Sequence, residues 1–205
     1  RKDAADIILR LSRLGAKLTL TTNATRLHEY VDVIKQAGIN SLNISLDTLN
    51  KERFIMMTKR DQFDRVRCNI DLMLREGIRV KVNVVAMKGL NDDEIIDFIQ
   101  WTKDAPVHVR FIEFMPFSGN RWNSDRVMTW QQILDVAGSS FDILPLEHEA
   151  HETAKKYTVP GHQGSFAVIS TMSAPFCGDC NRMRLTADGK MKNCLFSQTE
   201  TDLLT

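Results

Sequence analysis

One unit repeats through the first half of the chain: an amphipathic helix, then a glycine, then a strand. Apolar residues at helical spacing precede each of three glycines, Gly15, Gly38 and Gly77. A run rich in strand-forming residues follows each glycine, at residues 17–22, 41–46 and 79–85. Helices that alternate with strands at these lengths favour a parallel sheet with right-handed crossovers, either open or closed into a barrel. The pattern therefore predicts an α/β fold.

The alternation continues beyond residue 85. Asn91 and Glu94 have the spacing of a capping box, which predicts a helix ending near Lys103. Residues 108–114 are the next predicted strand.

Residues 116–164 are less regular, and we interpret them as a long connection that contains one helix. Thr129 and Gln132 predict the start of that helix. A fifth strand is predicted at residues 166–171.

Composition excludes several classes of protein. The chain has 205 residues, 43% of them hydrophobic, which suffices for one large domain or one domain with an appendage. Lys and Arg number 27 against 26 acidic residues, so the charge gives no support for a nucleic-acid partner. No apolar run reaches the roughly 20 residues that span a bilayer. We expect a soluble protein without a membrane partner.

Polar residues gather where the predicted strands end. They are Thr21, Thr22, Asn23, Ser45, Asp47, Glu113 and the nearby Met115. In parallel α/β folds the carboxyl ends of the strands form the ligand site. The alternative is that these residues are turn formers and helix caps.

Lys81 stands in the middle of an otherwise apolar strand. Alternation places Val80, Val82 and Val84 on one face and Lys81 with Asn83 on the other. A buried lysine is costly without a partner or a polar cavity. Lys81 is therefore a candidate for binding an anionic or carbonyl-bearing ligand, although its stem could instead extend out of an incomplete sheet to solvent.

Three of the four cysteines cluster near the end of the chain. Cys177, Cys180 and Cys194 have the spacing C-x2-C-x13-C, which suits a metal centre in a reducing compartment better than a disulfide. Three thiolates fit a cluster with one open iron, or a zinc ion with an open position. The fourth ligand could also be a histidine, and the candidates are His148, His151 and His162.

Two arginines follow the second cysteine. Asp188-Gly189 predicts a hairpin turn, and in an extended segment Cys180, Arg182 and Arg184 would point to one side. A thiolate beside two guanidinium groups could hold a polyanion against a metal centre. Alternatively, both arginines lie on an exposed hairpin with cross-strand partners.

Five segments, in order, resemble the radical S-adenosylmethionine (SAM) GTP 3',8-cyclase family of molybdenum cofactor biosynthesis. They are LTLTTNAT, LNISLD, VKVNVVAMKGLND, VRFIEFMPFSGNRWN and FCGDCNRMRLTADGKMKNCLF. The last is the most specific, because it combines CxxCxRxR with a third cysteine fourteen residues later. The MPF-x-GN-x-WN run is most similar to eukaryotic members.

The resemblance implies a role for each motif. Cys177, Cys180 and Cys194 would ligate an auxiliary 4Fe-4S cluster, Thr21, Lys81, Arg182 and Arg184 would bind GTP, and Ser45 and Met115 would bind SAM. The implied reaction converts GTP to (8S)-3',8-cyclo-7,8-dihydroguanosine 5'-triphosphate through a 5'-deoxyadenosyl radical. The implied fold is a partial TIM-like (β/α)6 half-barrel, with barrel elements at residues 1–125 and the cluster and GTP region at residues 126–205.

The chain departs from the family in one respect. The family's CxxxCxxC loop, which holds the SAM-cleaving second 4Fe-4S cluster, does not occur in these 205 residues. We therefore expect a C-terminal two-thirds fragment that lacks the first two barrel strands and is inactive alone. Its strand at residues 18–22 would be an unpaired edge.

Two other functions compete with this interpretation: a peptide-modifying radical SAM enzyme with an auxiliary cluster, and a zinc-stabilised binding domain.

The resemblance also implies an intracellular protein, in the mitochondrial matrix if eukaryotic and in the cytoplasm if bacterial. A homodimer is possible.

Overall fold

The computed structural model describes residues 2–117, 119–120, 122–147, 151–175, 177–197 and 199–203. The α-helices are α1 (Ala4–Ser12), α2 (Val31–Gln36), α3 (Lys51–Thr58), α4 (Phe63–Arg75), α5 (Ile95–Asp104) and α6 (Trp130–Gly138). Short 3-10 turns are η1 (Leu27–Glu29), η2 (Asp92–Glu94), η3 (Ser124–Arg126) and η4 (Cys177–Asp179). Within these residues, no helix combines the length and apolarity needed to cross a membrane.

The larger sheet has seven strands in the order β1-β2-β3-β4-β7-β6-β5. Its members are β1 (Leu20–Thr22), β2 (Ser41–Ser45), β3 (Arg79–Ala86), β4 (Val107–Glu113), β5 (Leu144–Pro145), β6 (Lys155–Thr158) and β7 (Ser165–Ile169). Neighbouring strands pair in parallel along the run β1-β2-β3-β4-β7. Strand β6 pairs antiparallel with β7, and β5 pairs antiparallel with β6. The sheet is therefore mixed, and β1 forms its edge as predicted.

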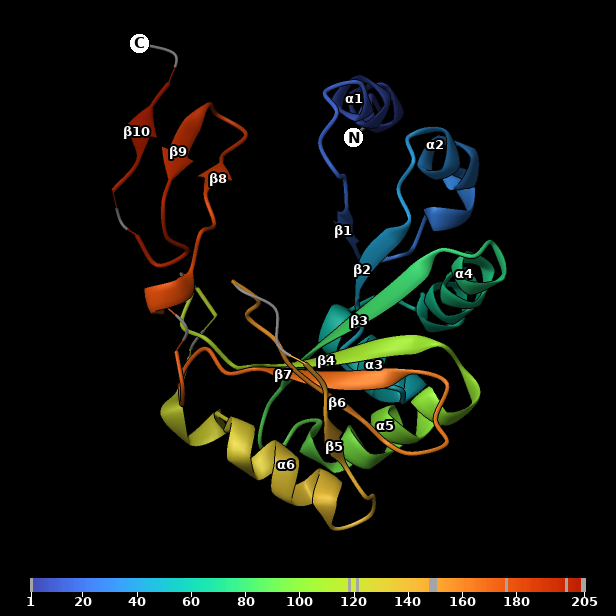
Figure 1. Ribbon diagram of the computed structural model, residues 1–205, viewed down its shortest axis with the longest axis vertical. Coiled ribbons are helices and arrows are strands. Elements are labelled where there is room, and N and C mark those ends of the chain that lie inside the picture. The colour runs from blue at the N-terminus through green and yellow to red at the C-terminus, as the bar shows by residue number, and fades with distance from the viewer. Residues whose placement is uncertain are drawn as a thin grey trace.

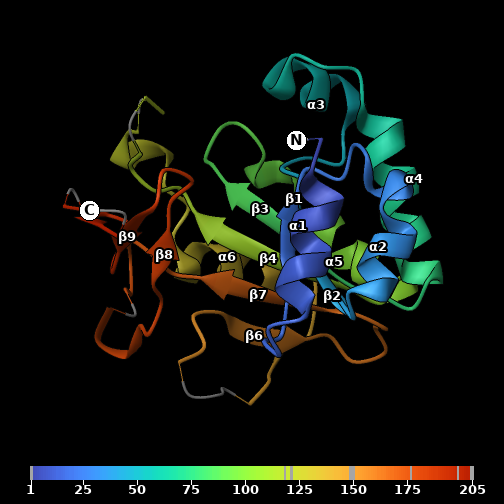
Figure 2. The ribbon, with the colours of Figure 1, turned by 90° about the horizontal axis from the view of Figure 1, so that it is seen from above.

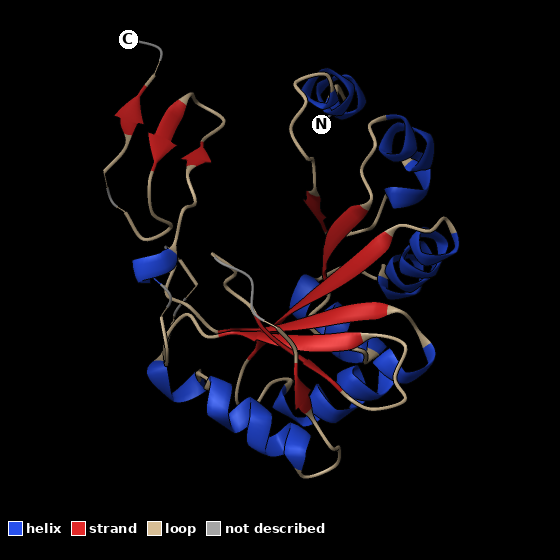
Figure 3. Ribbon diagram, viewed as in Figure 1, coloured by secondary structure: helices blue, strands red, loops and turns tan. Residues whose placement is uncertain are grey.

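A smaller sheet of three antiparallel strands follows, made of β8 (Arg184–Leu185), β9 (Lys190–Lys192) and β10 (Thr201–Asp202). Figure 1 shows the strands of the large sheet fanning out in an arc, with the helices on its outer side. The same layering is plain when the elements are coloured by type (Figure 3). From above, the small sheet stands on the side toward which the β4 and β7 arrows point (Figure 2).

The core lies between the sheet and the outer helices. Phe98, Phe111 and Phe166 are fully buried, and the Phe111 ring meets the other two edge-on, with centroids 6.2 and 6.4 Å away. Strand β4 alternates strictly between buried and half-buried residues. Its buried residues pack under the helices, which leaves the half-buried ones to face the inner side of the arc.

The alternation of the first half is confirmed, but several local predictions are wrong. Strand β1 is shorter than residues 17–22. Helix α3 and strands β5 and β6 were not predicted, because none of these three short elements has a clear apolar period. The helix start at Thr129 and Gln132 is confirmed as a complete capping box.

The capping box at Asn91 and Glu94 is a misreading. The buried Asn91 amide instead donates to the carbonyls of Asp47 and Val85, over 2.7 and 2.9 Å. Glu94 accepts from the hydroxyl of Thr48 and pairs with Arg53. Both residues therefore join two loops across the end of the sheet, a long-range role that their spacing cannot reveal.

Candidate functional site

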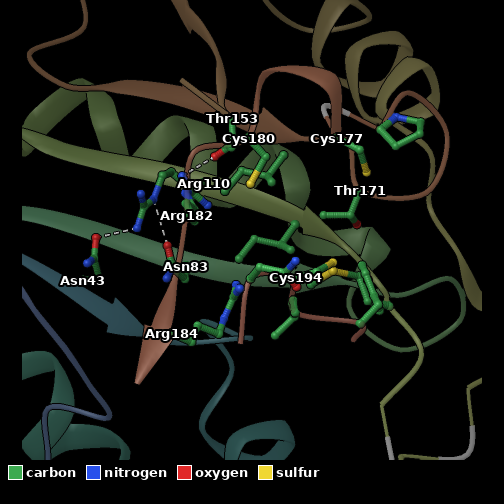
Figure 4. Close-up of a pocket in the computed structure, with 17 residues that line it drawn as sticks. Asn43, Asn83, Arg110, Thr153, Thr171, Cys177, Cys180, Arg182, Arg184 and Cys194 are labelled. Atoms are coloured by element: carbon green, nitrogen blue, oxygen red, sulfur yellow. Dashed lines mark hydrogen bonds between the residues drawn. The ribbon is translucent and has the colours of Figure 1, made fainter. Parts of the chain in front are cut away.

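A cavity of about 470 Å³ lies between the inner face of the sheet and the cysteine segment. The three cysteines line it together with Arg110, Arg182 and Arg184 (Figure 4). No carboxylate stands among the described residues that line it. Its volume is typical of sites for small molecules, and its charge suits an anion.

Arg110 is a site residue that the sequence analysis missed. It is a half-buried residue of β4, and its guanidinium donates to the side-chain oxygens of Asn83, at 2.8 Å, and Asn43. Burial, helped by the nearby charge of Arg182, lowers the pKa of Arg110 to about 10. The signal was available, because Arg110 interrupts an apolar strand just as Lys81 does.

The two hairpin arginines reach the cavity from the other side. Arg182 Nη2 donates to the hydroxyl of Thr153 over 2.7 Å, and Arg184 lies in β8 opposite Lys192. Only Arg184 and Leu185 of the predicted extended segment form a strand. Cys180, Arg182 and Arg184 nevertheless all line the same cavity.

Lys81 and Thr21 lie in one row across the sheet. Thr21, Asn43, Lys81 and His108 are register partners on successive strands, so they share the inner face. Burial, followed by the charge of Arg110, lowers the pKa of Lys81. Neither Lys81 nor Thr21 contacts the cavity itself, but Asn43 links Thr21 to Arg110 through its amide group.

The two residues predicted to bind SAM lie in different places. Met115 lines the main cavity, whereas Ser45 lines a smaller one of about 160 Å³ beside α3. The structure therefore does not bring them into a single pocket, and their role stays a prediction.

Several polar strand-end residues have structural partners. The hydroxyl of Thr22 accepts from the Ala24 amide, and the Asn23 side chain accepts from the Thr25 amide. Asp47 accepts from the Val85 amide over 2.8 Å, and burial raises its pKa.

Glu113 also does not fit the prediction that the polar residues at the strand ends form the ligand site. It is completely buried on the helix-covered side of β4, so it does not face the cavity. Its carboxylate instead accepts hydrogen bonds from the backbone amides of Trp130, Met172 and Ser173.

The three cavity thiols are free and exposed, as is Cys68. Among the described residues, no three Cys, His, Asp or Glu side chains are gathered closely enough to hold one metal ion. His162 is hydrogen bonded to Thr102 over 2.8 Å and packs edge-on to Phe141, whereas His148 lies outside the described residues. These observations do not support a zinc ion held by three cysteines and a histidine.

Known proteins are similar to nearly the whole length of the chain. The Radical SAM superfamily model matches residues 1–102, and the Molybdenum Cofactor Synthesis C model matches residues 107–205. Among solved structures, Streptococcus suis SuiB aligns with a TM-score of 0.61 at 14% identity, over 97% of this chain and 49% of that one. A domain of the pyruvate-formate lyase-activating enzyme from Bacteroides vulgatus aligns with a TM-score of 0.53 at 14% identity, over 67% of this chain and 85% of that one.

Curated relatives are much closer in sequence. The mitochondrial GTP 3',8-cyclase of Arabidopsis thaliana is 46% identical over 99% of this chain and 53% of its own length. Molybdenum cofactor biosynthesis protein 1 of Drosophila melanogaster is 42% identical over 99% of this chain and 36% of its own. The GTP 3',8-cyclase of Alkaliphilus oremlandii is 42% identical over 91% of this chain and 58% of its own.

The mixed α/β sheet and the superfamily match define a radical SAM fold. Within that class, the chain belongs to the GTP 3',8-cyclase family of molybdenum cofactor biosynthesis. It spans between 32% and 58% of the length of the curated relatives it matches.

Proposed function

We propose that this chain carries the substrate-binding part of a GTP 3',8-cyclase. The observation that carries the proposal is the cavity in which three thiols and three guanidinium groups meet. A triphosphate needs cations, and an iron–sulfur cluster needs thiolates. The match of residues 107–205 to the molybdenum cofactor model favours this function over a peptide-modifying radical SAM enzyme.

Cys177, Cys180 and Cys194 would hold the auxiliary 4Fe-4S cluster. The donor set fits, because these thiols are unpaired and all line the cavity. A four-iron cluster takes its cysteines on separate irons, so it does not require three sulfurs around one ion. With three protein ligands, one iron would remain open to the substrate.

Arg182 and Arg184 would bind the phosphates of GTP, and we add Arg110 to this set. All three line the cavity, and planar guanidinium groups make paired hydrogen bonds to phosphate oxygens. Lys81 and Thr21 would complete the site along the inner face of the sheet. Asn43 and Asn83 hold Arg110 in place.

Ser45 and Met115 would contact SAM at the carboxyl ends of β2 and β4, and the complete enzyme would use a second 4Fe-4S cluster to cleave it. When bound, the auxiliary cluster would supply an iron for the purine, and SAM would supply radical chemistry at the ribose. The residues of this chain would orient the ribose between these groups by holding the phosphates and the base.

The fold would be part of an incomplete six-stranded (β/α) barrel, to which β1–β4 and β7 contribute. The proposed division at residues 125 and 126 falls within one continuous sheet, because β4 pairs with β7. One relative is named as mitochondrial, which supports the mitochondrial matrix for a eukaryotic source.

Anaerobic reconstitution of the chain tests the cluster. We expect about four irons per chain, retained in Cys68→Ser and lost in Cys177→Ala. Zinc in place of iron would refute the proposal.

GTP titration of the reconstituted chain tests the arginines. Arg182→Ala should weaken binding, whereas Arg75→Ala, which removes an exposed arginine on the outer helix α4, should not. Equal affinity in both variants would contradict the phosphate role of Arg182.

A further inference from the structure

The buried carboxylate of Glu113 joins three parts of the chain. Glu113 is the last residue of β4, and its side chain accepts from the backbone amides of Trp130, Met172 and Ser173 over 2.7, 2.6 and 2.8 Å. The Ser173 hydroxyl is a fourth donor. Trp130 begins α6, so one side chain connects β4, the start of α6 and the loop after β7.

Glu113 and Arg110 lie on opposite faces of β4. Arg110 is half-buried and lines the cavity, whereas Glu113 has no exposed surface and points toward the helix layer. Glu113 therefore cannot touch a ligand in the cavity. Of the two segments that its side chain binds, the start of α6 and the loop at residues 171–173, the loop is the one that contributes a cavity residue, Thr171.

That loop leads directly into the cysteine segment. Thr171 and Pro175 line the cavity, and Cys177 follows four residues after Ser173. The Thr171 hydroxyl also donates to the backbone carbonyl of Glu113 over 3.4 Å. The end of β4 thus holds the loop at three successive residues, the last of which is four residues before the first thiol.

The negative charge of the Glu113 carboxylate strengthens the hydrogen bonds that make this connection. Hydrogen bonds to a charged acceptor are roughly twice as strong as neutral ones, and the start of a helix stabilises a nearby negative charge. All four donors are neutral, and the nearby charge of Lys155 also interacts with Glu113. Removing the carboxylate would leave the amides of Trp130, Met172 and Ser173 without this acceptor, although they are only partly shielded from solvent.

We propose that Glu113 is a positioning residue, which fixes the loop at residues 171–173 and thereby sets the place of Cys177 against the cavity arginines. The proposal rests on the proposed function, since the thiol matters as a cluster ligand. Replacing a residue that orients the ligands of a metal centre typically changes the protein's affinity for the metal by about 10- to 100-fold. Glu113 would act in this way through the backbone.

The test compares Glu113→Gln with Glu94→Gln. Glu94 is a matched control, because it is also a buried carboxylate, but its partners are Thr48, Leu49 and Arg53 at another loop. In the metal-free chain, Glu113→Gln should speed amide hydrogen exchange about tenfold across residues 170–177, and Glu94→Gln should not. In the reconstituted chain, Glu113→Gln should lose iron to a chelator about tenfold faster.

Wild-type exchange at residues 170–177 in a folded Glu113→Gln chain would overturn the proposal, and so would a wild-type rate of iron loss. If Glu113→Gln does not fold, Ser173→Ala replaces it, because this variant removes one donor and keeps the carboxylate. Ser173→Ala should raise exchange in the same segment by a smaller factor, and no change would refute the role. If the wild-type chain binds no four-iron cluster, the proposed function fails, while exchange in the metal-free chain still tests Glu113.

Discussion

Arg110 and Asn83 lie directly across from one another on β4 and β3, and the guanidinium of Arg110 donates to the Asn83 side-chain oxygen over 2.8 Å. This contact and the one to Asn43 hold a cation in the wall of the cavity. Burial lowers the pKa of Arg110 only to about 10, so the group remains charged at neutral pH.

Replacing Arg110 with Gln should weaken GTP binding by about 10- to 100-fold, because a hydrogen bond to a charged group contributes about 1.5–3 kcal/mol. Calorimetric titration of the reconstituted chain measures this change. Arg75→Gln on the outer helix is the matched control. Equal GTP affinity in wild type and Arg110→Gln would remove Arg110 from the site.

His108 should make stability depend on pH. Its Nδ1 lies 2.7 Å from the Ser165 hydroxyl, and burial lowers its pKa from 6.5 to about 4, with smaller effects from the charges of Arg110, Lys81 and Lys156. Between these pH values the unfolded chain binds more protons than the folded one, so stability falls as pH decreases from about 6.5 to about 4.

The loss in the free energy of unfolding that His108 causes over this pH range would be at most about 3 kcal/mol. Urea unfolding at a series of pH values should show this slope in the wild type and a smaller slope in His108→Gln. An identical slope in both proteins would show that His108 is not the responsible group.

Phe117 and Phe196 should stabilise each other beside the cavity, which Phe196 lines. Their rings are stacked with centroids 6.3 Å apart and planes at 16°. A double-mutant cycle with Phe117→Ala and Phe196→Ala should give a coupling free energy of about 0.5–1.5 kcal/mol. Additive losses in urea unfolding would mean that the two rings act independently.

Gly164 should not tolerate a side chain. A Cβ atom there would lie 2.1 Å from the backbone oxygen of Val107, where β4 begins. Gly164→Ala should therefore lower the free energy of unfolding by at least about 1–3 kcal/mol.

Gly138 is the matched control, because a Cβ atom at this position in α6 meets nothing within 4 Å. Gly138→Ala should leave stability unchanged or raise it by up to about 1 kcal/mol. Thermal unfolding of both variants measures the contrast. Equal melting temperatures would contradict the close approach at Gly164.

Local patterns determined much of the fold and part of the site. Helical apolar spacing followed by glycine and a strand predicted the first half of the sheet, because amphipathic periodicity reports which face of an element is buried. The spacing of Cys180, Arg182 and Arg184 predicted that they point to one side of an extended segment; all three line the cavity, although only Arg184 among them lies in a strand. The cysteine motif was also sufficient to indicate the family.

Only the tertiary structure decided which polar residues face the cavity. Arg110 and Glu113 are three residues apart and equally polar in sequence, yet one lines the cavity and the other is buried beneath the helices. Asn91 and Glu94 show the same limit, since their spacing resembled a helix cap, yet Asn91 binds Asp47 and Glu94 binds Thr48, each more than forty residues away. The physical reason is that hydrogen-bond partners of buried polar groups come from distant segments, whereas periodicity carries information only about neighbours along the chain.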